Sequence, residues 1–102
     1  MGLDSYYRKS QYVDLEGDLS YYFRGNIYRM FIQDSTGHSI QKEWIDNDEL
    51  IQIALKLSRF ILGNKRDFKN YYPDKEERGY VKELVANMCS KALEGYGLYG
   101  SF

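Results

Sequence analysis

The stretch from residue 46 to residue 63 constrains the fold most, because it carries both a helix start signal and a helical apolar period. Asp46 stands three residues before Glu49, which is the spacing of a capping box. Apolar side chains then recur every three or four residues, at positions 50, 53, 54, 57, 60 and 61, until Gly63 and Asn64 end the pattern. We expect a long helix whose apolar face is widened by Ile51, Leu55 and Leu62, so that it is buried on more than one side.

A second start signal lies at Pro73 and Asp74, with Glu77 three residues after the aspartate. The predicted inner stripe of this helix consists of Val81, Leu84, Val85, Met88 and Ala92, with Cys89 beside it. Gly95 ends the pattern. We expect residues 95–102 to form neither a helix nor a regular strand, and to be a flexible or docking tail.

Residues 26–35 fit either of two elements. Ile27, Tyr28, Phe31 and Ile32 share one helical face, with Asn26 as a candidate N-cap and Gly37 as a stop. A strand competes with the helix because isoleucine, tyrosine and phenylalanine all favour strands.

The N-terminal region has strand character. Residues 3–13 have high β propensity, residues 15–18 resemble a turn, and residues 19–23 can return as a second strand of a hairpin. Residues 38–45 form a short extended segment. We therefore expect an α+β fold over residues 1–102, in which an N-terminal β-hairpin packs on about three α-helices in a single small domain.

Composition limits the possible partners and compartment. The net charge is −1, so the chain lacks the excess positive charge that nucleic-acid binding relies on. It also lacks an apolar run long enough to span a membrane. We therefore expect neither nucleic acid nor a membrane as a partner. The single cysteine, Cys89, predicts a reduced thiol in an intracellular, cytoplasmic protein. Residues 1–50 hold five basic and nine acidic residues, whereas residues 51–102 hold nine and six, so the halves attract each other within one domain or across a dimer.

Four short motifs give the chain a resemblance. They are Met1-Gly2-Leu3-Asp4-x-Tyr6, Phe23-Arg24-Gly25-x-x-Tyr28, Thr36-Gly37-x-Ser39 and Glu43-Trp44-Ile45. Over roughly residues 1–60 the chain resembles a group of small phage and bacterial proteins of unknown function. The resemblance implies a bacterial or phage origin and a helix at residues 26–35, but no activity. Many of these proteins carry a Cys-Gly-Gly stretch before the Arg-Gly unit, whereas residues 15–22 here contain only Gly17 and no cysteine.

The Arg24-Gly25-Asn26 junction is a candidate site for a small phosphorylated or carboxylated ligand. A helix N-terminus offers unpaired N–H groups, a glycine permits close approach, and arginine binds anions with two donors. Tyr28 and Arg29 would complete this site. In the structural alternative, Arg24 pairs with an acidic residue of the same chain and Gly25 only turns the backbone.

Tyrosine is unusually frequent, with 11 residues in the chain. Adjacent tyrosines in a strand point to opposite faces, so each pair places one ring outward. We expect an interface that includes Tyr7, Tyr22, Tyr71, Tyr72 and Tyr99, because such rings are typical of protein interfaces. The alternative is that the tyrosines fill a small core.

The remaining motifs indicate no chemistry. Basic residues alternate with aromatic ones between Lys56 and Tyr72, which we interpret as a solvated face and loop rather than a nucleic-acid site. His38 beside Ser39 is not a catalytic arrangement, and one cysteine with one histidine make no metal cluster. We expect no catalytic residues, metal or cofactor. The sequence predicts an accessory protein that binds a protein partner or a second copy of itself, with the anion binder as the alternative.

Overall fold

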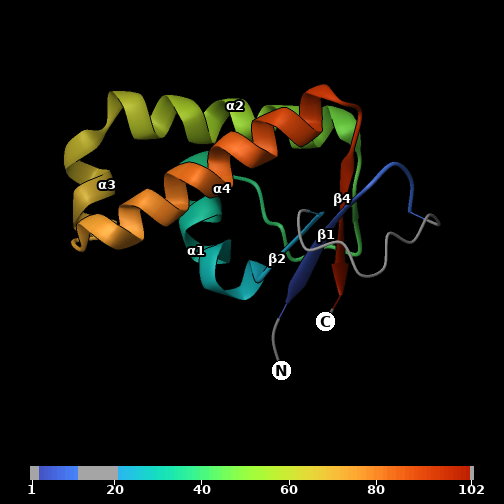
Figure 1. The fold of residues 1–102 in the computed structure, drawn as a ribbon, viewed down its shortest axis with the longest axis horizontal. Coiled ribbons are helices and arrows are strands. Elements are labelled where there is room, and N and C mark those ends of the chain that lie inside the picture. Colours follow the sequence, from blue (N-terminus) through green and yellow to red (C-terminus); the bar gives the residue numbers. More distant parts are fainter. Residues whose placement is uncertain (1–2, 12–20, 102) are drawn as a thin grey trace.

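A four-stranded antiparallel sheet lies at one end of the molecule, and the helices extend away from one of its faces (Figure 1). The computed structural model describes residues 3–11 and 21–101. The strands in those residues are β1 (Asp4–Arg8), β2 (Tyr22–Phe23), β3 (Trp44–Ile45) and β4 (Gly97–Ser101). The helices are α1 (Gly25–Thr36), α2 (Asn47–Gly63), α3 (Lys65–Tyr71) and α4 (Lys75–Leu93). The predicted α+β class is confirmed.

The sheet has the strand order β2-β1-β4-β3. β1 pairs antiparallel with β2, as the predicted hairpin requires, although β1 is shorter than the expected 3–13 and the predicted turn at 15–18 lies outside the described residues. Within the predicted extended segment 38–45, Trp44 and Ile45 form β3.

The expectation for residues 95–102 is wrong, because Gly97–Ser101 forms β4, one of the two inner strands of the sheet. It pairs with all five residues of β1, from Asp4 opposite Ser101 to Arg8 opposite Gly97, and with β3 on its other side. Glycines are unfavourable in strands, which is why the segment does not look like one. Here they are needed for close approach, since a Cβ on Gly100 would lie 2.2 Å from the Lys42 carbonyl oxygen.

Helix α2 has the predicted start and end. The Asp46 side chain accepts a hydrogen bond from the Glu49 N–H at 2.9 Å, and the helix ends at Gly63. Its buried residues are Leu50, Ile53, Ala54, Leu57 and Ile61. Leu55 and Leu62 are exposed, however, so the expectation that they are buried on a second face is wrong. One stripe of α2 packs inward, and the side that carries these two leucines remains at the surface.

Helix α1 confirms the helical interpretation of residues 26–35, but its cap differs from the expectation. Arg24 occupies the N-cap position, and Asn26 lies inside the first turn with its N–H donated to the Leu3 carbonyl at 3.0 Å. Gly37 ends the helix with a φ of 77°, a conformation that glycine adopts without strain.

Helix α4 confirms the second capping signal, since the Asp74 side chain caps it and Val81, Val85, Met88 and Ala92 are buried. Helix α3 was not expected and brings the number of described helices to four. Its basic and aromatic residues form a helix rather than a loop because Phe68 is buried, with its ring 5.9 Å from Phe31.

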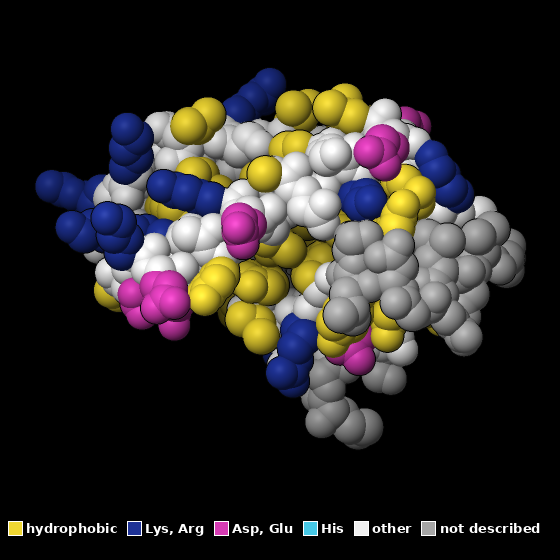
Figure 2. Space-filling model, in the orientation of Figure 1, with side chains coloured by type: hydrophobic (Ala, Val, Ile, Leu, Met, Phe, Trp, Pro, Cys, Tyr) yellow, Lys and Arg dark blue, Asp and Glu magenta, His cyan; other side chains and the backbone are white. Residues whose placement is uncertain are grey.

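The core lies between the sheet and the helices. The largest fully buried side chains include Tyr7 and Leu98 from the sheet, Phe31 and Ile32 from α1, and Leu50, Ile53 and Leu57 from α2. Basic side chains gather at the opposite end of the molecule, where α2, α3 and α4 meet (Figure 2). None of the helices in the described residues has the length and apolar character needed to cross a membrane.

Candidate functional site

The predicted anion site begins at Gly25, and the space beside this glycine is already filled. Gly25 is buried, and a Cβ there would lie 2.4 Å from Ser5 Oγ and 3.0 Å from a methyl carbon of Leu3. The absence of a side chain therefore lets α1 pack directly on β1. The open backbone that we expected a ligand to approach is occupied by the chain itself at this point.

The other residues of that site have separate surroundings. Arg29 donates from Nη1 to the Gln41 side-chain oxygen at 3.0 Å, and the half-buried Tyr28 ring lies edge-on to Phe23 at 6.2 Å. Burial also raises the pKa of Tyr28. Arg24 is exposed at the N-cap. The anion site at Arg24, Gly25 and Asn26 remains a prediction, without the free approach at Gly25 that motivated it.

Tyr7 is not a surface residue, so its predicted place in an interface is wrong. Its side chain is fully buried, with the ring 5.6 Å from Phe23, and burial raises the pKa of its hydroxyl. Alternation along β1 does place one ring of the Tyr6–Tyr7 pair on each face. We expected the Tyr7 ring to point outward, but Ser5 and Tyr7 face the helices and Tyr6 faces outward.

Four aromatic residues form a row across the outward face of the sheet, which we call the aromatic row. Tyr22 of β2 pairs with Tyr6 of β1, Tyr6 pairs with Tyr99 of β4, and Tyr99 pairs with Trp44 of β3. All four side chains are half-buried. Each of the four strands thus contributes one ring at the same level of the sheet. Tyr22 and Tyr99 were predicted interface residues, whereas Tyr6 and Trp44 were not.

Contacts within the face hold these rings in place. The Tyr6 and Tyr22 ring centroids are 5.2 Å apart, and the Arg8 guanidinium carbon lies 3.9 Å from the centroid of Tyr99. The Tyr22 hydroxyl donates to Asp4 Oδ1 at 3.1 Å. Desolvation, together with that hydrogen bond, raises the pKa of Tyr22. The rings are therefore positioned within the single chain, which lowers the entropy cost of using them to bind.

Tyr71 and Tyr72 belong to a different cluster. Their ring centroids lie 5.3 and 5.2 Å from that of Phe31, and the Tyr71 hydroxyl donates to Asp34. Burial raises the pKa of Tyr72 to about 12. These rings join α3 to α1, so the structure does not bring them together with Tyr22 and Tyr99.

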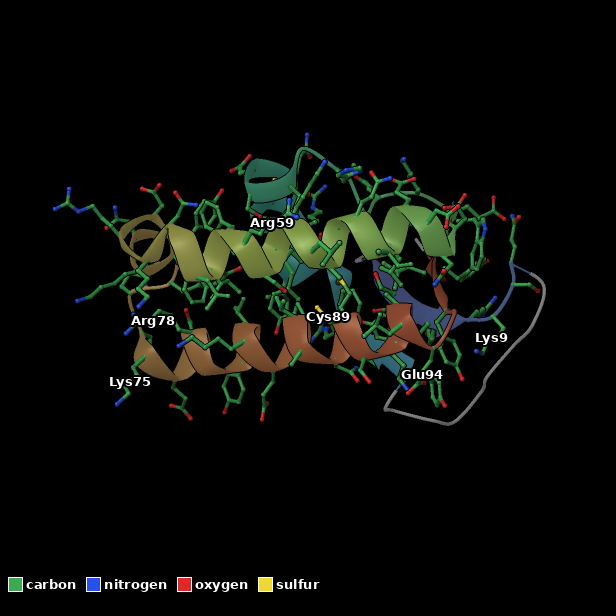
Figure 3. The ribbon with its side chains drawn as sticks, turned by 90° about the horizontal axis from the view of Figure 1, so that it is seen from above. Lys9, Arg59, Lys75, Arg78, Cys89 and Glu94 are labelled. Carbon is green, nitrogen blue, oxygen red and sulfur yellow. The ribbon has the colours of Figure 1, made fainter. Side chains whose placement is uncertain are left out.

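The reactive side chains are engaged in local contacts. His38 Nδ1 lies 3.4 Å from Glu49 Oε2, and its Nε2 lies 3.0 Å from the Lys56 ammonium. Cys89 points from α4 toward α2, where its sulfur lies 3.3 Å from the Ser58 hydroxyl (Figure 3). Within residues 3–11 and 21–101, no three histidine, cysteine or acidic side chains are grouped so that they could hold a metal ion.

Comparison with known proteins adds no relative. No family model, no curated protein and no solved structure matches this chain significantly. The function must therefore be argued from the chain itself, and the aromatic row brings two predicted interface residues, Tyr22 and Tyr99, together with Tyr6 and Trp44 on one face of the sheet.

Proposed function

We propose that this protein acts by binding a protein partner through the aromatic row, and that a second copy of the chain is the partner that this surface fits. The alignment of Tyr22, Tyr6, Tyr99 and Trp44 across all four strands is the observation that supports the proposal. Tyrosine and tryptophan combine a large apolar ring with a polar group, and both are enriched in the cores of protein interfaces.

The chemistry of the row suits pairing with itself. A tyrosine hydroxyl both donates and accepts hydrogen bonds, so the same patch on two copies can be complementary. Twofold symmetric dimers use one patch in this way. The net charge of −1 produces little repulsion between two copies. A second copy is therefore the simplest occupant of this face.

The cellular setting belongs to the same proposal. The resemblance of residues 1–60 to small phage and bacterial proteins, together with a lone half-buried cysteine, supports an accessory protein that works in a bacterial cytoplasm. Binding rather than catalysis would be its role in that setting.

Sedimentation velocity over a range of protein concentrations tests the proposal. We expect the wild type to dimerise, and Tyr99→Ser to raise the dissociation constant about tenfold or more, equivalent to at least about 1.4 kcal/mol. Tyr80→Ser is the matched control because Tyr80 is exposed on α4, outside the row, and this variant should associate like the wild type.

Two results would contradict the proposed function. One is a wild type that remains monomeric up to about 1 mM, the concentration at which an association of only about 4 kcal/mol is half complete. The other is equal association of the wild type and the Tyr99→Ser variant, with both folded by circular dichroism. That result would place the dimer contact elsewhere on the molecule.

A further inference from the structure

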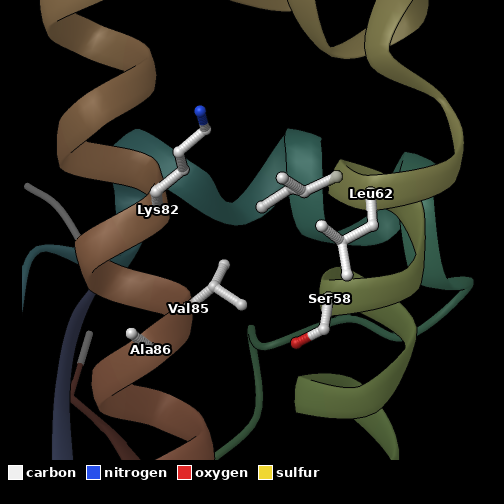
Figure 4. A pocket seen from close by; sticks show the side chains of 6 residues that line it. Ser58, Leu62, Lys82, Val85 and Ala86 are labelled. Carbon is white, nitrogen blue, oxygen red and sulfur yellow. The ribbon is translucent and has the colours of Figure 1, made fainter.

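Helices α2 and α4 leave an apolar groove open at the surface. Ser58 and Leu62 of α2 face Lys82, Val85 and Ala86 of α4 across it (Figure 4). This hollow has a volume of about 210 Å³. Leu62 is 73% exposed although it borders the groove. A leucine in this position contributes little to the core of its own chain and is available to a partner.

The apolar surface continues along both helices beyond the hollow. Leu55 lies seven residues before Leu62 on α2, and Leu93 lies seven residues after Ala86 on α4, so each pair shares one side of its helix. Leu55 is 50% exposed and Leu93 is 84% exposed. Exposed apolar side chains that lie together on a soluble protein commonly mark a binding site.

The groove becomes basic toward α3. A second hollow of about 440 Å³ shares Ile61, Leu62 and Lys82 with the first, so the two are continuous. Its other lining residues are Lys65, Phe68, Lys69 and Arg78, and no acidic side chain lines either hollow. This end of the groove therefore presents four cations around an apolar floor.

None of these four cations forms an ion pair within residues 3–11 and 21–101. Within the described residues, Glu49 is the acidic partner of Lys42 and also lies beside His38, and both contacts are away from the groove. Arg78 is fixed at the rim, because its Nη1 donates to the carbonyl oxygens of Tyr72 and Pro73 at 2.8 and 2.7 Å, and these neutral acceptors leave its charge in place. A partner that brings negative charge would find complementary groups here.

We propose that this groove binds an acidic amphipathic helix of a partner protein. Leucine-type side chains of the helix fill the apolar hollow between Ser58 and Ala86, and its aspartate or glutamate side chains meet Lys65, Lys69 and Lys82. The apolar surface extends along two long helices, which matches a helix better than a small amphiphile. A second copy of the chain that met this groove with its own groove would bring the same cations and be repelled, so a symmetric dimer does not form here and this site is separate from the aromatic row.

Fluorescence anisotropy with a labelled synthetic peptide tests the proposal. The probe is a helical peptide of about 18 residues, close to the length of α2, with leucines at every third or fourth position and glutamates elsewhere. We expect it to bind the wild type, and Leu62→Ser and Lys82→Glu each to weaken binding about tenfold or more. Leu62 is exposed, so its replacement should leave the fold intact.

Controls separate a specific groove from general charge attraction. Arg59→Glu makes the same charge change on the side of α2 that faces away from α4, and it should change the affinity less than about twofold (Figure 3). A peptide with lysines in place of the glutamates should not bind. Equal weakening by Lys82→Glu and Arg59→Glu, or equal binding of both peptides, would overturn the proposal.

Membranes are the other surface that combines apolar contact with negative charge. Vesicles of phosphatidylserine and phosphatidylcholine, tested by co-sedimentation, distinguish this case. Binding to the vesicles without binding to the glutamate peptide would overturn the proposal, as would the absence of any peptide binding. Peptide binding that requires Leu62 and Lys82 would support it.

Discussion

Gly25 of α1 lies directly against the Ser5 hydroxyl of β1, so that a Cβ on Gly25 would stand 2.4 Å from Ser5 Oγ. The hydroxyl is buried and has no hydrogen-bond partner within the described residues. This contact, together with the hydrogen bond from the Asn26 N–H to the Leu3 carbonyl, joins α1 to the sheet. The Arg-Gly-Asn junction thus has a packing role whether or not it also holds a ligand.

The first prediction follows from this contact. Gly25→Ala should lower the free energy of unfolding by about 1–3 kcal/mol, because an added methyl group overpacks a closed contact. Ser5→Ala alone should be neutral or stabilising, since it removes a buried hydroxyl that makes no hydrogen bond. The double variant should recover part of the loss. Urea unfolding measures all three, and additive effects in the double variant would contradict the contact.

A matched pair of leucines tests the one-sided burial of α2. Leu57 is fully buried and Leu62 is exposed on the same helix. Leu57→Ala should cost about 2–5 kcal/mol, as buried leucine truncations do, whereas Leu62→Ala should stay within about 0.5 kcal/mol. Thermal or chemical unfolding measures both. Similar losses in the two variants would mean that Leu62 belongs to the core and is not available to a partner.

Two glycines should respond to alanine with opposite signs. In β4, a Cβ on Gly100 would meet the Lys42 carbonyl oxygen at 2.2 Å, so Gly100→Ala should destabilise the sheet by about 1–3 kcal/mol. In α4, a Cβ on Gly79 would meet no atom within 4 Å. Gly79→Ala should therefore stabilise the protein by up to about 1 kcal/mol through helix propensity. A stable Gly100→Ala variant would argue against the place of β4 between β1 and β3.

Alkaline pH should destabilise the fold through buried tyrosines. Burial raises the pKa of Tyr72 to about 12 and also raises the pKa of Tyr7. The hydroxyls of these two tyrosines therefore stay protonated in the folded chain at a pH at which they ionise in the unfolded chain, where the tyrosine pKa is about 10. The stabilisation is complete below pH 10 and is lost as the pH rises toward 12, at about 1.4 kcal/mol per pH unit for each group.

Tyr7→Phe isolates one of these groups. The Tyr7 hydroxyl makes no hydrogen bond within the described residues, so the variant should be as stable as the wild type at neutral pH. Urea unfolding at about pH 9 and about pH 11 should show a smaller loss in the variant than in the wild type. An equal loss in both proteins would show that Tyr7 is not buried as a neutral phenol.

The helices were largely predictable because their signals are local. Asp46 and Asp74 cap α2 and α4 with hydrogen bonds to residues two or three positions later, and the apolar period then identifies the buried stripe. Helix α3 was missed because a single buried ring, Phe68, holds it in place. Its packing partner Phe31 is remote in sequence, so no local pattern marks the helix.

The sheet and the aromatic row were only partly predictable because they depend on pairing between distant residues. Tyr6 and Tyr99 become neighbours only when β4 pairs with β1, and the glycines of β4 argue against a strand by local propensity. The alternation of the Tyr6–Tyr7 pair was evident, but its phase depends on which face the helices cover. The packing of Gly25 on Ser5 shows that the helices cover the face that carries Ser5 and Tyr7, and no spacing in the sequence reveals this contact.

Fluorescence of Trp44 as a function of protein concentration tests the proposed function most directly. Trp44 is the only tryptophan of the chain and belongs to the aromatic row, so a dimer formed through this face buries it further. We predict that its emission moves to shorter wavelength as the concentration increases, and that Tyr99→Ser shifts this transition to a concentration about tenfold higher or more. An emission spectrum that stays constant over a range in which the protein dimerises would contradict binding through the aromatic row.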